Sequence, residues 1–252
     1  MTAKAPRAYA HARILARKAQ LLGAREGALL LTAANPPAAL AALGGDPFEK
    51  LLRIYELAIR TYRAPIFRAL LGLHEIENVK LLWRAAANDR GHAAVQRLWL
   101  PLGALATVEM PRDVLSPRGV AEHLAATPYG TIAKSVLRSG AGDAAFDRWA
   151  RQRVLDEAKR LPKAEALTRA IIDHVILSRA DGEGSRRPRS FASLRMTRAF
   201  AAAPFLLAPA VAVVLLAEAE VRAVRAIVER GGDASLDDAV MRVVAQSQMG
   251  GA

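Results

Sequence analysis

Four times along the chain, a residue whose side chain can cap a helix stands directly before a proline. The four pairs are Asn35-Pro36, Asp46-Pro47, Ser116-Pro117 and Thr127-Pro128. The capping oxygen can accept an N–H of the first turn, and proline suits the first helical position because no N–H is needed there. The pairs predict helices near 36–43, 117–125 and 128–138, and a long helix from residue 47 that Pro65 kinks.

Most of the remaining chain also has helical periodicity. Apolar residues recur at three- and four-residue spacing, and no segment shows the sustained alternation of a half-buried strand. Ala, Leu and Arg, which favour helices, dominate the composition, and aromatic residues make up only 5%. We therefore predict an all-α fold without a sheet. The further predicted helices are 7–23, 74–88, 143–160, 164–179, Pro209 to about Arg230, and a last one from Ser235 to about Gln246.

The stretch 74–84 is predicted to organise the fold. Its apolar stripe consists of Ile76, Val79, Leu82 and Trp83. Glu75 and Glu77 are expected in the first turn of this helix, where the helix dipole favours negative charge, and Glu77 can pair with Lys80. Asn78 is a poor helix former beside an apolar stripe, so we expect its side chain to bond to a specific partner.

The pattern of this stretch returns twice in weaker form, at 172–179 and 218–225. Asn78, His174 and Glu220 align, but their spacings are unequal, which argues against a short-period solenoid. Chance recurrence of acidic helix starts is one interpretation, and a chain of three related helical subdomains with a shortened last member is the other. The predicted division is 1–90 for the first subdomain, 91–180 for the second, 181–203 for a basic disordered insertion and 204–252 for a truncated third subdomain.

The formal net charge of +12 and pI of about 10.8 favour binding to polyanions. Five arginines between Arg186 and Arg198 concentrate this charge in a segment without a clear period, 181–200, which is predicted to be a disordered insertion. A basic helical nucleic-acid-binding protein is therefore one alternative. Phe191 is the one aromatic residue beside these arginines, and no helix-turn-helix is apparent, which disfavours that alternative.

The segment 199–217 carries no charge, and its length admits a membrane-anchored protein as a further alternative. Pro204 and Pro209 interrupt the run, which is rich in alanine. A helix that starts at Pro209 would continue into a charged, amphipathic second half. A buried core helix is therefore the favoured interpretation.

Motifs that carry catalytic chemistry are missing from the sequence. There is no phosphate-binding glycine loop, no dinucleotide-binding turn and no nucleophile elbow, and the five histidines lack metal-ligand spacing. Cysteine is absent, which excludes disulfides and thiolate chemistry. Glu75 and Glu77 point to different helix faces, which does not suit paired acid–base catalysis. We predict a protein without an active site or cofactor.

Five short motifs, taken in order, resemble the C-type subunit family of archaeal and bacterial V/A-type rotary ATPases, whose eukaryotic relative is the d-type subunit of V-ATPases. The motif residues are Tyr9 and Arg13 near the N-terminus; Glu77, Asn78, Lys80 and Arg84; Thr127, Pro128 and Tyr129; Asp173 and His174; and Glu218, Glu220 and Arg222. The second group is similar to that family's acid-x-Asn-Leu-Lys/Arg helix start, and the third to its threonine-proline-tyrosine/phenylalanine start. His174 stands where the family usually has asparagine. The resemblance covers about 8–179 and 204–246.

The resemblance implies a funnel-like array of three related helical subdomains. Proteins of that family are non-catalytic. They join the membrane rotor ring of proteolipid subunits to the D and F subunits of the central stalk, and they couple ATP synthesis or hydrolysis to proton or sodium transport. They are cytoplasmic and peripheral to the membrane. This chain is shorter than usual between the second and third repeats, where 181–200 has no counterpart, so the third subdomain is expected to be truncated.

Overall fold

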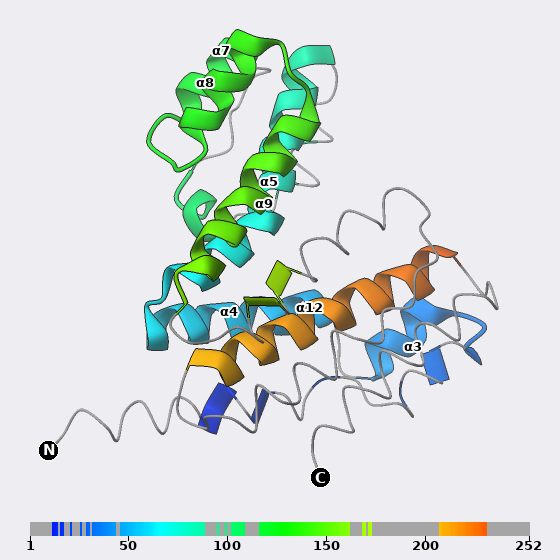
Figure 1. Cartoon of the computed structure of the whole chain (residues 1–252). Coiled ribbons are helices and arrows are strands. Elements are labelled where there is room, and N and C mark those ends of the chain that lie inside the picture. The colour runs from blue at the N-terminus through cyan, green and yellow to red at the C-terminus, as the bar shows by residue number, and fades with distance from the viewer. Residues whose placement is uncertain are drawn as a thin grey trace, which may run out of the picture. The chain divides into compact units, whose positions relative to one another are not determined.

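The computed structural model shows a helical protein (Figure 1). Within the residues described, no strand occurs, and the predicted all-α fold is confirmed. The described residues are 12–14, 16–17, 21, 26, 29–30, 32–43, 46–88, 95, 99, 102–108, 116–161, 168–169, 171–172 and 207–230.

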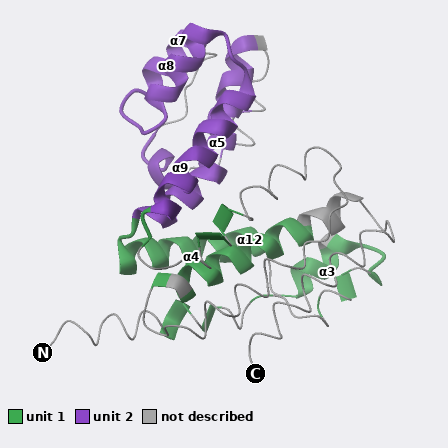
Figure 2. Ribbon diagram, viewed as in Figure 1, with its two compact units in different colours: residues 1–64, 160–252 green, residues 65–159 purple. Residues whose placement is uncertain are grey.

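The described elements fall into two compact units, residues 1–64 with 160–252 and residues 65–159 (Figure 2). The first unit contains helices α3 (Pro36–Ala42), α4 (Pro47–Tyr62) and α12 (Leu207–Arg230). The second unit contains α5 (Pro65–Asn88), the short 3-10 helix η1 (Gly103–Leu105), α7 (Pro117–His123), α8 (Gly130–Ser139) and α9 (Asp143–Lys159).

Three of the four predicted capping residues begin a helix as expected. The Asn35 Oδ1 atom accepts the Ala38 N–H at 3.2 Å, and Asp46 Oδ1 accepts the Phe48 N–H at 2.9 Å. The Ser116 Oγ atom accepts the Gly119 N–H at 3.2 Å and caps α7. Each satisfies one of the donors that the first turn of a helix leaves unpaired.

The fourth pair, Thr127-Pro128, was wrongly predicted to begin its helix at residue 128. Thr127 Oγ1 accepts the Tyr129 N–H at 3.1 Å and donates to the Leu124 carbonyl at 2.8 Å. These bonds stabilise a turn that follows α7, and α8 begins only at Gly130. The predicted capping bond is present, but it closes a turn, and the helix begins two residues later than expected.

Pro65 begins a helix rather than kinking one, which corrects two predictions. Helix α4 ends at Tyr62, because Arg63 adopts a left-handed conformation with φ of 51° and donates its N–H to the Ile59 carbonyl at 3.0 Å. Helix α5 then runs unbroken for 24 residues. Glu75 therefore lies in the middle of a helix, and its expected place in a first turn near residue 74 is wrong.

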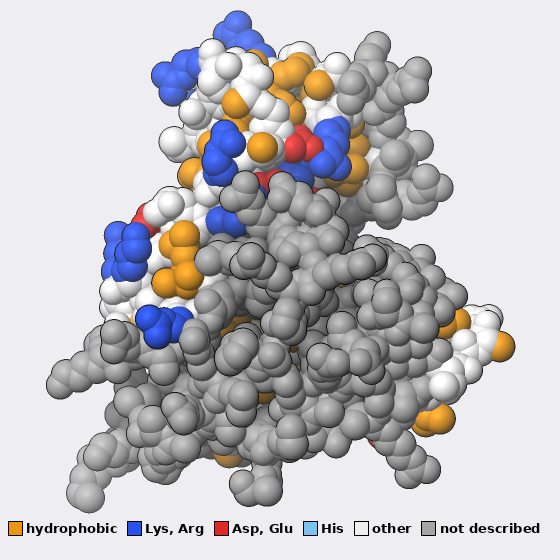
Figure 3. All heavy atoms as spheres, turned by 45° about the vertical axis from the view of Figure 1, so that its right-hand side comes forward, with side chains coloured by type: hydrophobic (Ala, Val, Ile, Leu, Met, Phe, Trp, Pro, Cys, Tyr) orange, Lys and Arg blue, Asp and Glu red, His pale blue; other side chains and the backbone are white. Residues whose placement is uncertain are grey.

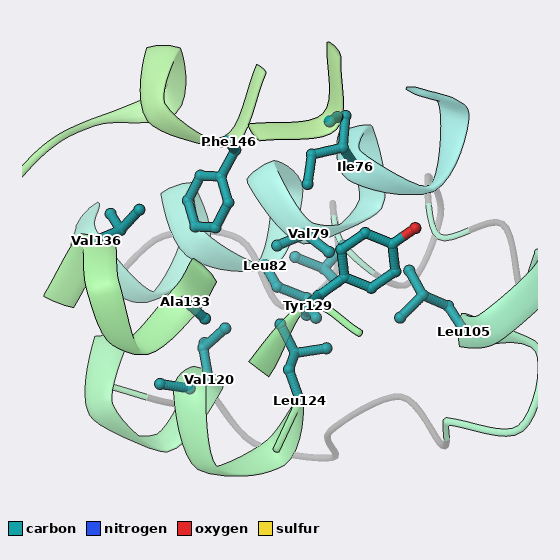
Figure 4. Close-up of a cluster of buried hydrophobic side chains, with 13 residues drawn as sticks. Ile76, Val79, Leu82, Leu105, Val120, Leu124, Tyr129, Ala133, Val136 and Phe146 are labelled. Carbon is teal, nitrogen blue, oxygen red and sulfur yellow. The ribbon is translucent and has the colours of Figure 1, made fainter. Parts of the chain in front are cut away.

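The core of the 65–159 unit forms where α5 packs against α7, η1 and α9. Of the predicted apolar stripe of α5, Ile76, Val79 and Leu82 are buried, and Trp83 is half-buried against the same core. The Tyr129 ring lies among these side chains (Figure 4). On α9, Phe146 and Val154 are fully buried and Trp149 is half-buried.

The other unit contains the pair α4 and α12, with α3 also against α12. Every residue from Ala210 to Glu218 is buried, so the predicted core helix is confirmed. It begins at Leu207 and ends at Arg230, close to the predicted limits. No described helix is long and apolar enough to cross a membrane.

The grouping into units differs from the predicted boundary at residue 90. Helix α5 spans 65–88 and packs on α9, so residues on both sides of that boundary belong to one unit. The helix predicted at 164–179 is described only at four helical residues. The predicted insertion at 181–203, the predicted helix after Ser235, and the motif residues Tyr9, Asp173 and His174 lie outside the described residues.

Candidate functional site

The motif residues on α5 join this helix to α9 through ion pairs. Lys80 Nζ lies 2.6 Å from Glu77 Oε1 and 3.0 Å from Asp147 Oδ1. One turn further along, Arg84 pairs with Asp143. The later residue on α5, Arg84, pairs with the earlier residue on α9, Asp143, so the two helices run antiparallel.

Aromatic packing accompanies these ion pairs. The rings of Trp83 and Phe146 meet edge to face with centroids 5.4 Å apart. Among the coloured side chains in Figure 3, acidic groups lie next to basic ones. The motif thus supplies charge pairs and an apolar stripe to one helix–helix contact.

Lys80 is unusual among these charges because its side chain is only 8% exposed. Burial alone would lower the pKa of Lys80. The hydrogen bonds and negative charges of Glu77 and Asp147 outweigh that effect and raise the pKa above its ordinary value. The ammonium group therefore stays charged, and it serves as a buried anchor between α5 and α9.

Glu75 lies on α5 at the centre of a second group of polar contacts, and it is only 4% exposed. Its Oε1 atom accepts the backbone N–H of Ala104 and, at 3.2 Å, that of Leu105. Its Oε2 atom accepts the hydroxyl of Tyr129 at 2.8 Å. One carboxylate therefore ties α5 to the 3-10 helix η1 and to the start of α8.

Gly103 makes the close approach of η1 to this carboxylate possible. Its φ is +47°, a conformation that residues with a Cβ atom adopt with difficulty. A Cβ atom built at this position would lie 2.6 Å from Glu75 Oε1 and 2.9 Å from Leu71 Cδ2. Both the backbone conformation and the available space therefore require glycine.

Tyr129 links Glu75 to α9. Its ring meets Trp149 edge to face at 5.5 Å, and the guanidinium carbon of Arg153 lies 4.9 Å from the centre of the Trp149 ring. The Thr127 hydroxyl fixes the Tyr129 backbone, as described above. The threonine-proline-tyrosine motif thus positions a buried hydroxyl on the α5 carboxylate.

The electrostatic setting of this pair follows from its burial. Burial raises the pKa of Glu75, while the hydrogen bonds from Tyr129, Leu105 and Ala104 and the charge of Arg153 partly oppose the increase. Burial, followed by the Glu75 charge and hydrogen bond, also raises the pKa of Tyr129. The tyrosine hydroxyl therefore keeps its proton, and the site acts as a set of hydrogen bonds.

The 1–64 and 160–252 unit contains a related pair. The Tyr55 hydroxyl of α4 donates to the Glu218 carboxylate of α12, and both residues are buried. Burial raises the pKa of Tyr55, the charge and hydrogen bond of Glu218 raise it further, and the positive charge of Arg222 opposes them. Glu220 is also buried on α12.

The structure thus brings some predicted residues together and separates others. Within the 65–159 unit, Lys80 and Arg84 pair with residues of α9, while the exposed Glu77 pairs with Lys80 on α5 itself. Tyr129 meets Glu75, whereas Pro128 is exposed. The Asn78 side chain is 5% exposed and does not lack a polar partner. In the other unit, Arg13 is exposed, Glu218 and Glu220 are buried, and Arg222 is half-buried.

Sequence reasoning missed the part played by Glu75, which was considered only for the helix dipole and for catalysis. It also missed Asp143, Asp147, Arg153 and Gly103. Local patterns could have singled out the two aspartates, which are four residues apart on α9 and match the spacing of Lys80 and Arg84. Nothing local marks Arg153 or Gly103.

The chemistry of these contacts is that of structural connections. Glu75 is enclosed by donors, and its closest partners are backbone amides and a tyrosine that keeps its proton. Across the described part of the chain, no group of three His, Cys, Asp or Glu residues could hold a metal ion. The best-defined candidate site is therefore the Glu75–Tyr129 tie with its neighbouring ion pairs.

Comparison with known proteins finds no match to this chain among protein-family models, curated protein sequences or solved structures.

Proposed function

We propose that this chain is a non-catalytic central-stalk or rotor subunit of a V/A-type rotary ATPase. In this role it connects the membrane ring of proteolipid subunits to the D and F subunits of the stalk. It thereby couples ATP synthesis or hydrolysis to proton or sodium transport. The proposal rests on the order of the five motifs along the chain, and the all-α fold is compatible with it.

The strongest support for the proposal is that several motif residues hold the helices of the 65–159 unit together. Lys80 and Arg84 hold α5 on α9, and Tyr129 holds the start of α8 on α5. Lys80 and Tyr129 make these contacts from buried positions, whereas the Arg84 pair is partly exposed. An element that transmits torque needs helices that resist sliding, and buried, oriented polar contacts oppose sliding because each displacement leaves polar groups unpaired.

The test is affinity purification of the tagged full chain from its own cells in a mild detergent. The expected result is co-purification of proteolipid, D and F subunits, identified by mass spectrometry, and no ATP hydrolysis by the chain alone. Glu122→Gln provides a matched control, because Glu122 is exposed and pairs with Arg118 on the same helix, so this variant should recover the same partners.

Two results would contradict the proposal. One is a failure to recover ring or stalk subunits when both are present in the extract. The other is ATP hydrolysis by the purified chain that persists in Glu75→Ala and Glu77→Ala after contaminants are removed. Recovery of nucleic acid in place of these subunits would favour the basic nucleic-acid-binding alternative.

A further inference from the structure

The Glu75 carboxylate holds together three segments that are distant in sequence. It lies on α5, and its bonds reach Ala104 and Leu105 of η1 and Tyr129 before α8. The Gly103 conformation brings η1 close enough for these bonds. Moving η1 away would therefore admit water to a carboxylate that is now 4% exposed.

We propose that Glu75 is a proton-linked latch: it holds η1 and the start of α8 on α5, and a proton bound to its carboxyl strengthens that hold. The closed arrangement accommodates both forms of the carboxyl. A carboxylate accepts all three hydrogen bonds. In the neutral form, Oε1 still accepts the amides, and the bond between Oε2 and Tyr129 reverses: the proton on Oε2 is donated to the Tyr129 oxygen, and the Tyr129 hydroxyl no longer donates to the carboxyl.

Among the described residues, charged or titratable groups approach Glu75 from α9 and from the start of α8. Helix α9 contributes Arg153, the start of α8 contributes Tyr129, and η1 contributes backbone amides. Helix α7 faces the same core with the apolar residues Val120, Ala121 and Leu124. On α5 itself, the nearest titratable residues in sequence are His74, which is half-buried, and Glu77, which is exposed and paired with Lys80.

The direction of the effect follows from the burial. In the open state, in which η1 has moved away from α5, Glu75 is hydrated and has an ordinary pKa of about 4.3. In the closed state, burial raises its pKa, and the hydrogen bonds and Arg153 only partly oppose this. The closed state thus binds the proton more tightly, so the latch is strongest at low pH and weakens as the pH rises through the closed-state pKa.

Hydrogen exchange of the Ala104 and Leu105 amides in the full chain, followed by NMR from about pH 5 to pH 8, tests this latch. After correction for intrinsic exchange, the protection factors of these two amides should fall as the pH rises. The fall should be up to tenfold for each unit by which the Glu75 pKa of the closed state exceeds that of the open state. Glu75→Gln should remove this pH dependence. Glu122→Gln, on exposed helix surface, should keep it.

A second variant keeps the proposal testable if Glu75→Gln does not fold. The Tyr129 hydrogen bond lowers the Glu75 pKa, so Tyr129→Phe should move the midpoint of the pH dependence to higher pH. Protection that increases with pH, or that depends on pH equally in Glu75→Gln and the unaltered chain, would overturn the proposal. A midpoint unchanged in Tyr129→Phe would also count against it.

Discussion

Helices α5 and α12 are both 24 residues long, and each buries a glutamate near its middle. In each case the carboxylate accepts a hydrogen bond from a tyrosine hydroxyl that lies outside its own helix: Tyr129 for Glu75 and Tyr55 for Glu218. An arginine acts electrostatically on each pair, Arg153 in one unit and Arg222 in the other.

The surroundings of the two glutamates differ. Glu218 follows an unbroken run of buried apolar residues, 210–217, and its tyrosine lies on the partner helix α4. Glu75 lies on a helix that also carries exposed charged residues, and its carboxylate also holds the backbone of η1. The same side-chain pair thus joins two helices in one unit and fixes a turn in the other. What a tyrosine–glutamate pair does depends on the donors that surround it.

The largest expected effect comes from replacing each glutamate by leucine. Glu75→Leu leaves a buried hydroxyl and two backbone amides without their acceptor and should destabilise the chain by roughly 3–5 kcal/mol. Glu218→Leu extends an apolar run, and the Tyr55 hydroxyl loses its acceptor, so the expected cost is about 1–3 kcal/mol. Denaturant unfolding measures both, and equal costs would remove the distinction between the two pairs.

Gly103→Ala tests whether the turn depends on close approach to Glu75. Gly140→Ala is a matched control, because Gly140 also has a positive φ, 65°, but nothing lies within 4 Å of its Cβ position. Gly140→Ala should lower the free energy of unfolding by about 1–2 kcal/mol, which is the cost of the left-handed conformation alone. Gly103→Ala should cost about 2–4 kcal/mol, because it also displaces the Glu75 carboxylate. Similar melting curves for the two variants would argue against a steric requirement at the turn.

Asn78 provides a third comparison, because it is a polar residue buried on α5 beside the apolar stripe. Asn78→Leu should lower the free energy of unfolding by about 1–3 kcal/mol, since a buried polar partner would be left unsatisfied. Chemical denaturation of the two proteins gives this difference directly. A change within about 0.5 kcal/mol, the usual range for surface substitutions, would show that the side chain makes no stabilising contact.

The smallest expected effect concerns the ion pair between Lys80 and Asp147. Asp147→Asn should cost roughly 1–2 kcal/mol, because Lys80 is buried, whereas Glu122→Gln in the exposed Arg118 pair should stay within about 0.5 kcal/mol. The pKa of Lys80 is raised in the folded chain. The contribution of protonated Lys80 to the free energy of unfolding is therefore complete below the unfolded-state pKa of about 10.4, and it is lost as the pH rises through the folded-state pKa. A pH titration of stability that shows no alkaline loss would contradict this assignment.

Sequence patterns alone predicted much of the helical framework. Asn35, Asp46 and Ser116 each cap a helix as expected, because a cap depends only on residues within one turn. The start of α12 near Pro209 and the buried stripe of α5 were also predictable, since periodic apolar residues define a buried face. The break at Arg63 was not predicted, because no glycine stands at the left-handed position and Pro65, two residues later, was interpreted as a kink within one helix.

The candidate site was decided by tertiary structure. Tyr129 reaches Glu75 across 54 residues of sequence, and Lys80 reaches Asp147 across 67. Helical periodicity shows which face of α5 is apolar, but it does not show which donors will surround a glutamate on that helix. Burial, the pKa shift of Glu75 and the need for glycine at residue 103 exist only after η1, α8 and α9 pack on α5, because each arises from atoms that separate segments bring within contact distance.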